Sequence, residues 1–185
     1  MHFILIYSRM YPMGIKYDES GSVVEQESSE RPFRGFFGHY NHALDVKNRA
    51  FIPAKFRGGL APGFMLTKGI DTCLIGYPFE DWHRIVNNFK KVPFTDAAGR
   101  EFIRFFNGSV YDCDVDKQMR FCIPLELREY AQLNKDICFV GMIDYFEIWD
   151  SARWKEASSK YDGNASLQAE KMQKYLYFDD GVPTG

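Results

Sequence analysis

Residues 45–57 read DVKNRAFIPAKFR, and residues 116–128 read DKQMRFCIPLELR. At a fixed offset of 71 positions, both stretches give the pattern Asp-x-x-x-Arg-x-x-Ile-Pro-x-x-x-Arg. The identical pairs are Asp45 and Asp116, Arg49 and Arg120, Ile52 and Ile123, Pro53 and Pro124, and Arg57 and Arg128. Self-similarity at a fixed period is the signature of a structural unit that occurs more than once. We therefore expect two copies of one fold.

The segments that follow the two motifs also correspond. Apolar runs at 64–67 and 73–77 follow the first motif, and runs at 137–141 and 146–149 follow the second. Each set then enters a stretch with a tryptophan in its first turns, Trp82 or Trp154. Each repeat is therefore predicted to be strand, turn, strand, short helix, strand, turn, strand, helix. This order indicates an α+β fold, mainly β, with flanking helices.

The repeated motif itself predicts a hairpin. Strands are expected at 36–44 and 109–115, tight turns at 45–48 and 116–119, and short return strands at 49–52 and 120–123. An aspartate that opens a turn can accept backbone N–H bonds and fix the loop, which is the role predicted for Asp45 and Asp116.

The helices are predicted from proline, glycine and periodicity. Pro53 and Pro124 suit the first position of a helix, where a missing N–H costs little. The first short helix should end at Gly58-Gly59, and the second near Asn134. Residues 78–91 and 95–106 have helical apolar spacing, and Thr95 is the expected cap of the latter.

Lengths and composition suggest four segments: an N-terminal extension at 1–33, expected to be flexible, repeats at 34–92 and 93–160, and a C-terminal tail at 161–185.

The chain is 45% hydrophobic, which allows a packed core, and its net charge of −2 gives no overall attraction to nucleic acid. No run approaches the roughly 20 apolar residues of a membrane span. We expect a cytoplasmic protein.

Local charge is more informative than net charge. Residues 31–57 hold one acidic residue, Asp45, against six basic ones: Arg31, Arg34, Lys47, Arg49, Lys55 and Arg57. Residues 112–128 hold three basic residues against four acidic ones. An arginine offers a planar fork of donors that suits phosphate or guanine. The first repeat is thus the better candidate for a DNA contact, and an Asp–Arg ion pair that only stabilises the hairpin is the alternative.

Other signals argue against metal and catalytic sites. Asp112, Asp114 and Asp116 begin like a calcium loop, but the sixth position is Lys117 and the glutamate at the twelfth is missing. His39 and His42 would lie on opposite faces of a strand. The four cysteines lack metal-binding spacing and are expected to be core thiols. No nucleophile–base set is visible, so we expect no enzyme, no metal and no cofactor.

The doubled motif, together with the FEIWD block at 146–150, resembles the MraZ family over about residues 36–160. The resemblance implies a swapped-hairpin barrel of the AbrB-like kind, with both halves supplied by one chain. It also implies a ring-shaped homo-oligomer, associated with the nucleoid, that binds direct repeats of double-stranded DNA upstream of its own gene. Such a protein would regulate transcription of the cell-division and cell-wall gene cluster.

The family's motif residues fall on Asp45, Arg49, Asp116 and Arg120, with Lys47, Asn48, Lys55, Arg57 and Lys117 as further DNA-contact candidates. The family usually has glycine before each motif arginine, whereas this chain has Asn48 and Met119. Since methionine tolerates positive φ badly, we expect the second turn to differ in shape. An oligomeric protein-interaction module of the same fold, without DNA binding, is the alternative function.

Overall fold

The computed structural model describes residues 16–17, 23–24 and 35–176. The expected flexible extension at 1–33 and the end of the tail fall largely outside this part of the chain, as do Arg31 and Arg34. The strands are β1 (Lys16–Tyr17), β2 (Val23–Val24), β3 (His39–Ala43), β4 (Arg49–Phe51), β5 (Gly63–Lys68), β6 (Leu74–Pro78), β7 (Tyr111–Asp114), β8 (Arg120–Cys122), β9 (Asp136–Gly141) and β10 (Phe146–Asp150). The helices are α2 (Arg57–Leu60), α3 (Phe79–Phe89), α4 (Ala97–Asn107), α5 (Leu125–Tyr130), α6 (Ser151–Gly163) and α7 (Ala165–Leu176).

The expected α+β class is confirmed, with antiparallel strands and six helices among the described residues. Helices occupy more of these residues than strands do, so the expectation of a mainly β fold is wrong. The reason is the length of α3, α4, α6 and α7, which follow or connect the repeats. The pair β1–β2 belongs to a unit separate from residues 33–185.

The two repeats exchange strands. The large sheet has the order β3-β9-β10-β6-β5-β7, so the first strand of each repeat pairs with a strand of the other repeat. A second, two-stranded sheet pairs β4 with β8, again one strand from each repeat. Its register places Arg49 opposite Cys122, Ala50 opposite Phe121 and Phe51 opposite Arg120. The β4–β8 ribbon is therefore symmetric about Ala50 and Phe121 under the 71-residue repeat.

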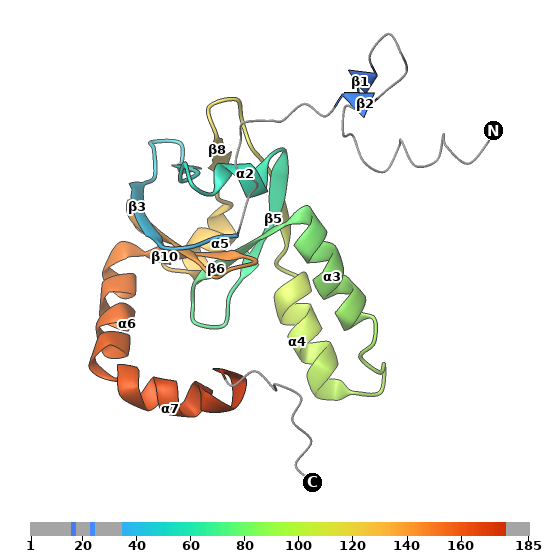
Figure 1. The fold of residues 1–185 in the computed structure, drawn as a ribbon, viewed down its shortest axis with the longest axis vertical. Helices are drawn as coiled ribbons and strands as arrows, with labels where there is room; N and C mark the ends of the chain where they lie inside the picture. Colours follow the sequence, from blue (N-terminus) through green and yellow to red (C-terminus); the bar gives the residue numbers. More distant parts are fainter. Residues whose placement is uncertain (1–15, 18–22, 25–34, 177–185) are drawn as a thin grey trace, which may run out of the picture. The chain divides into compact units, whose positions relative to one another are not determined.

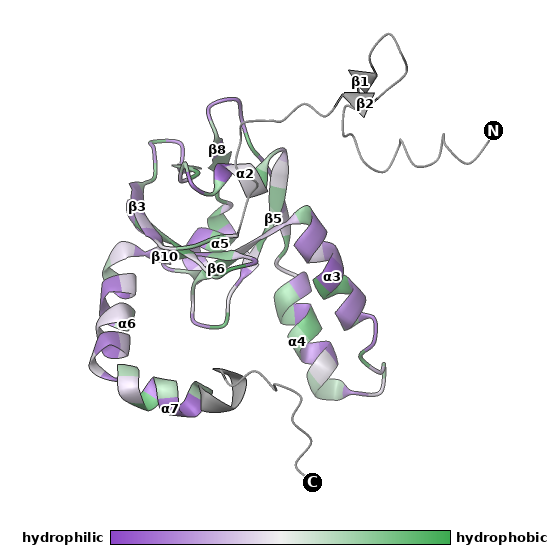
Figure 2. Cartoon of the chain, in the orientation of Figure 1, coloured by the Kyte–Doolittle hydropathy of each residue, from purple (hydrophilic) through white to green (hydrophobic). Residues whose placement is uncertain are grey.

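The central strands of the large sheet are covered on both faces, whereas the edge strand β3 is partly exposed. One face packs against the β4–β8 ribbon, α2 and α5 in a core that includes Ile52, Phe64, Phe121, Leu127, Phe139 and Phe146. The other face packs against α3, α4 and α6 around Ile75, Trp82, Phe106, Val140 and Trp149. Figure 1 shows α3, α4, α6 and α7 on one side and the loops before β4 and β8 on the other. In Figure 2 these two loops are coloured largely as hydrophilic.

Several helix boundaries differ from the sequence-based prediction. Pro53 does not start a helix, since residues 54–56 form a turn and α2 begins only at Arg57 and continues through Gly58 and Gly59. Burial of Phe56 and Leu60, both fully enclosed, fixes this position. Pro124 lies just before α5 as its cap.

The ends of α5 and α4 also differ. Helix α5 ends at Tyr130, not near Asn134, because Gln132 takes a positive φ of 53° and the Leu133 N–H bonds back to the Arg128 carbonyl at 2.9 Å. Asp96, not Thr95, caps α4: its carboxylate accepts a bond from the Gly99 N–H at 3.0 Å.

Strand β3 is shorter than predicted, since Gly38 has a φ of 78° and Phe36 makes only an isolated bridge to Ile143. Cys73, Cys113 and Cys138 are buried as expected, but Cys122 is exposed, because its position on the short strand β8 faces outward. No helix among the described residues is long and apolar enough to cross a membrane.

A tight contact between β6 and β10 gives a prediction for stability. Gly76 lies opposite Phe146, and a Cβ built on Gly76 would overlap the Phe146 ring. That ring is enclosed by Phe36, Phe56, Phe64 and Phe139, so it has no free direction in which to move. We expect Gly76→Ala to lower the free energy of unfolding by about 1–3 kcal/mol. The measurement is the urea unfolding midpoint.

Gly163→Ala is the matched control, because nothing lies within 4 Å of a Cβ built there. It should leave the urea midpoint unchanged or raise it slightly. Equal midpoints for Gly76→Ala and the wild type would show that the Phe146 ring is not confined as described.

Candidate nucleic-acid interface

The turn between β3 and β4 is organised by one carboxylate. Asp45 Oδ1 accepts bonds from the backbone N–H of Lys47 at 2.8 Å and of Arg49 at 3.0 Å. The backbone of Asp45 also bonds to the turn, with its carbonyl accepting from the Asn48 N–H at 2.9 Å. Asn48 has a φ of 58°, which asparagine tolerates better than most residues. A short local network thus fixes residues 45–49.

The same carboxylate holds the arginine that follows. Arg49 Nε donates to Asp45 Oδ2 at 2.7 Å, and Arg49 Nη2 lies 2.7 Å from the same oxygen. A guanidinium carries five N–H donors, so this ion pair leaves donors for a further partner. The Arg49 side chain is 29% exposed, which means that the pair lies at the surface.

The turn between β7 and β8 has the same geometry. Asp116 Oδ1 accepts from the N–H groups of Gln118 at 2.9 Å and Arg120 at 3.0 Å, and Arg120 Nε donates to Oδ2 at 2.9 Å. Met119 takes a φ of 60°, almost the value of Asn48. The prediction of a differently shaped second turn is therefore wrong. The four bonds to Asp116 and the packing of Met119 against the core impose a conformation that methionine alone disfavours.

The ion pairs shift the acidity of both carboxyl groups. The hydrogen bond from the Arg49 side chain, with the backbone bonds of the turn, lowers the pKa of Asp45 from 3.8 to about 2. The bond from the Arg120 side chain likewise lowers the pKa of Asp116. Both carboxylates therefore remain charged, and both turns remain fixed, at any pH near neutrality.

The β4–β8 ribbon places the two turns at its opposite ends. The Ile52 N–H bonds to the Met119 carbonyl at 2.9 Å, and the Ile123 N–H bonds to the Asn48 carbonyl at 3.3 Å. Each turn is thus attached to the return strand of the other repeat. Asn48 is four residue steps from Ile52, which lies level with Met119, and this corresponds to about 13 Å along the ribbon.

The other candidate residues divide into two groups. Lys47 and Lys117 are exposed on the two turns, next to Arg49 and Arg120 respectively. Lys55 and Arg57 lie further along, in the turn before α2 and in its first residue. Arg57 Nε also donates to the Ile52 carbonyl at 3.4 Å, as Arg128 Nε does to Ile123 at 3.1 Å. These two arginines therefore support the Ile-Pro segments, a role that the repeat could have shown but that we had not predicted.

Strand exchange adds residues that the linear sequence did not associate with the first turn. A hollow of about 380 Å³ beside this turn is lined by Leu44, Asp45, Val46, Asn48, Arg128, Leu133, Asn134 and Lys135. The Leu44 N–H bonds to the Lys135 carbonyl at 2.8 Å, which fixes the approach of β9 to the turn. Arg128 and the exposed Lys135 thus add positive charge from the second repeat to the first turn.

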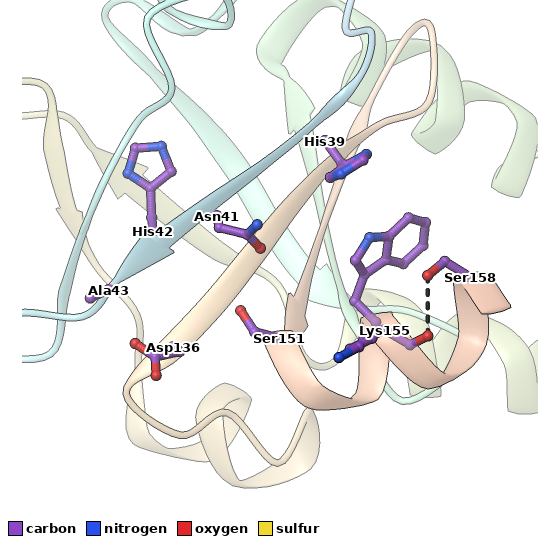
Figure 3. Close-up of a pocket in the computed structure, with 9 residues that line it drawn as sticks. His39, Asn41, His42, Ala43, Asp136, Ser151, Lys155 and Ser158 are labelled. Atoms are coloured by element: carbon purple, nitrogen blue, oxygen red, sulfur yellow. Dashed lines mark hydrogen bonds between the residues drawn. The ribbon is translucent and has the colours of Figure 1, made fainter.

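A second hollow lies away from the turns, between β3 and the start of α6 (Figure 3). Its volume is about 650 Å³, and its lining is His39, Asn41, His42, Ala43, Asp136, Ser151, Trp154, Lys155 and Ser158. His39 packs near Trp154 and His42 near Phe139, on opposite faces of the strand as predicted. Burial and the nearby Arg57 lower the pKa of His42. The side chains here show no hydrogen-bonded nucleophile–base pair among the described residues.

Several other reactive groups in the described part of the chain are enclosed, although the Cys122 thiol is exposed. Burial raises the pKa of the Cys73 thiol to about 12, and burial also raises the pKa of Glu147, which accepts a bond from Trp149 Nε1 at 2.8 Å. No group of three or more histidine, cysteine or acidic side chains in these residues could hold a metal ion. The paired turns of the ribbon are the candidate site.

Fold and site together define a class of protein: a single chain in which two α+β repeats exchange strands and present two Asp-fixed arginine turns on a shared ribbon. Residues 36–105 and 106–176 each match the family described as "MraZ protein, putative antitoxin-like". A transcriptional regulator MraZ of Clostridium acetobutylicum is 45% identical over 140 residues, which cover 75% of this chain and 97% of that protein. The MraZ regulator of Acetivibrio thermocellus is 44% identical over 137 residues, or 74% and 96% of the two chains. The chain belongs to the MraZ family.

The Asp45 ion pair gives a prediction for titration. Because the folded pKa is lowered, the interaction is fully present above the ordinary value of 3.8 and is lost as the pH falls through about 2. NMR titration of the Asp45 carboxyl should show a midpoint near 2. In Arg49→Ala the midpoint should move up toward 3.8, since the largest cause of the shift is removed.

Arg84→Ala is the control for this titration, because Arg84 pairs with Asp81 on α3 and not with either turn. It should leave the Asp45 midpoint unchanged. An Asp45 midpoint near 3.8 in the wild type would contradict the ion pair itself.

The positive φ of Asn48 gives a prediction for stability. Asn48→Ala should reduce the free energy of unfolding by about 1 kcal/mol, since alanine pays the full cost of the left-handed conformation. Asn48→Gly should fold with a stability close to the wild type, because glycine adopts this conformation freely. Chemical unfolding of the three proteins measures both. Equal losses for the two variants would mean that the Asn48 side chain, rather than its backbone, stabilises the turn.

Proposed function

We propose that this chain is a sequence-specific DNA-binding transcriptional regulator that reads DNA with the turns at the two ends of the β4–β8 ribbon. The observation that carries the proposal is the presence of two arginines, Arg49 and Arg120, each fixed by an aspartate in the same way at the surface. A purely local ion pair would explain one such turn. Two copies on one ribbon present two oriented arginines to the same partner. The relatives are named as transcriptional regulators.

The dimensions of the ribbon support DNA as the partner. The major groove is about 12 Å wide and admits a two-stranded β-ribbon. The two turns are separated by a similar length, about 13 Å. Arginines at the two ends can therefore reach base edges or the phosphates at the groove rims. Arginine is well suited to the O6 and N7 acceptors of guanine.

Exposed lysines supply the phosphate contacts. Lys47, Lys117 and Lys135 lie at or beside the turns, and Lys55 and Arg57 extend the basic surface beyond Ile52. Asp45 and Asp116 are each paired with their own arginine, so each pair is neutral overall. The positive charge of the lysines therefore remains. In this proposal lysines contribute affinity, and arginines on the ribbon contribute sequence preference.

The finer parts of the proposal are those that the resemblance to the MraZ family implies. The exchanged strands would close into an AbrB-like barrel, and several copies would form a ring that aligns their turns with direct repeats in the promoter of the protein's own gene. The regulated genes would be the cell-division and cell-wall cluster, and the protein would reside in the cytoplasm at the nucleoid. Multiple weak contacts in a ring gain affinity through raised effective concentration.

A mobility-shift titration tests the function. DNA from upstream of the protein's own gene would be compared with a scrambled duplex at two salt concentrations. We expect the wild type to prefer its own DNA, and Arg49→Ala and Arg120→Ala each to lose about 1–3 kcal/mol of that preference, roughly five- to 150-fold. Lys47→Ala should weaken binding to both duplexes and reduce the salt slope by about 1.

Arg84→Ala is the matched control, since it removes an exposed, ion-paired arginine on α3 and should bind as the wild type does. If the wild type does not distinguish the two duplexes at either salt concentration, the proposed sequence-specific DNA binding is wrong. The search would then turn to protein partners of the same fold.

A further inference from the structure

The outer face of the β4–β8 ribbon carries four side chains. Ala50 and Phe121 point inward, where they are 0% and 2% exposed and belong to the core. Strand alternation directs their neighbours outward, and we call this set the outer ribbon face: Arg49, Phe51, Arg120 and Cys122. This face lies between the two turns, so DNA bound to both turns would cover it.

The outer ribbon face is not symmetric, although the ribbon backbone is. Phe51 and Cys122 are equivalent positions of the two repeats, 71 residues apart. Arg120 pairs with Phe51 across the ribbon, and its guanidinium lies over the Phe51 ring at 5.7 Å from the centroid. Arg49 pairs instead with Cys122, a small thiol. Only one of the two arginines therefore rests on an aromatic ring.

The Phe51 ring is available for a second contact. Phe51 is 39% exposed, although a phenylalanine usually gains stability by burial. Asp116 holds Arg120 through its Nε and Nη2 groups, and the cation–π contact with Phe51 also favours this position of the guanidinium. The partly exposed ring and the Arg120 guanidinium therefore lie beside each other on the outer ribbon face. DNA bases offer hydrogen-bond acceptors and, in thymine, a methyl group, so they can contact both an oriented donor and an apolar ring.

We propose that Phe51 discriminates between DNA sequences by contacting the C5-methyl group of a thymine next to the base that Arg120 reads. Thymine is the only base with a methyl group in the major groove, and apolar side chains recognise it by contact. Phe51 would act in two ways, as a support that positions Arg120 and as the surface that meets the methyl group. This inference rests on the proposed DNA-binding function.

One consequence concerns the symmetry of the DNA element. The half of the ribbon with Phe51 and Arg120 selects a methyl-bearing pyrimidine, whereas the half with Arg49 and Cys122 does not. A single chain then reads two unlike halves. The charge distribution of the sequence favours the first repeat, whereas the proposed contact combines Phe51 of the first repeat with Arg120 of the second.

Single thymine-to-uracil replacements across the bound DNA test the proposal, because each removes one methyl group and nothing else. We expect wild-type affinity to fall about fourfold at one or two positions, as one methyl group removed from water would give. Phe51→Ala should bind the thymine and uracil duplexes equally at those positions. Phe51→Gln, which keeps the length of the side chain but is polar, should give the same result and serves if Phe51→Ala does not fold.

Phe94→Ala is the matched control. Phe94 is 86% exposed and also lies against an arginine, Arg100, but it belongs to the connection between α3 and α4. This variant should keep the wild-type uracil pattern. If uracil changes nothing for the wild type, or changes the Phe51 variants by the same factor, the proposal is overturned while DNA binding itself stands. If the wild type does not prefer its own upstream DNA, the proposed function itself is contradicted.

Discussion

The pairing of β4 with β8 is the constraint on which the rest of the structure depends. Neither repeat can form this ribbon alone, because each supplies only one strand of three residues. The pairing buries Ala50 and Phe121 against the large sheet and attaches each turn to the return strand of the other repeat. The strands that precede the turns then pair across the repeats as well, β3 with β9 and β7 with β5. A hydrophobic core shared by two repeats is the result.

The two aspartates give this ribbon two oriented arginines at its surface. Each fixes a turn with bonds to backbone N–H groups and orients an arginine with its second oxygen. An arginine held in place loses less side-chain entropy when it binds a ligand than a free one does. The same bonds permit a residue other than glycine at the positive-φ position, and Met119 demonstrates this. The turn is therefore defined by Asp and Arg more than by the residue between them.

Duplication has also allowed the two halves to diverge. The backbone of the ribbon keeps its symmetry, while Phe51 and Cys122 occupy equivalent outward positions with very different surfaces. The first turn gathers positive charge, some of it from Arg128 and Lys135 of the other repeat. The second turn lies beside Asp112 and Asp114 and instead stacks its arginine on Phe51. The two ends of the ribbon therefore differ in charge and in exposed apolar surface.

Features that depend on neighbouring residues could be predicted from the amino-acid sequence. Motifs or periodicity within about a dozen positions, where hydrogen bonds are local, predict the Asp–Arg turns, the order of strands and the helix α3. The recurrence of the motif after 71 residues predicts two copies of one unit. The other features depend on contacts made in the tertiary structure. Strand exchange, the outward position of Cys122 and the contact of the Arg120 guanidinium with the Phe51 ring all depend on pairing between segments about 70 residues apart. Such pairing leaves no local pattern, because its free energy comes from burial and hydrogen bonds that exist only once both repeats are folded together.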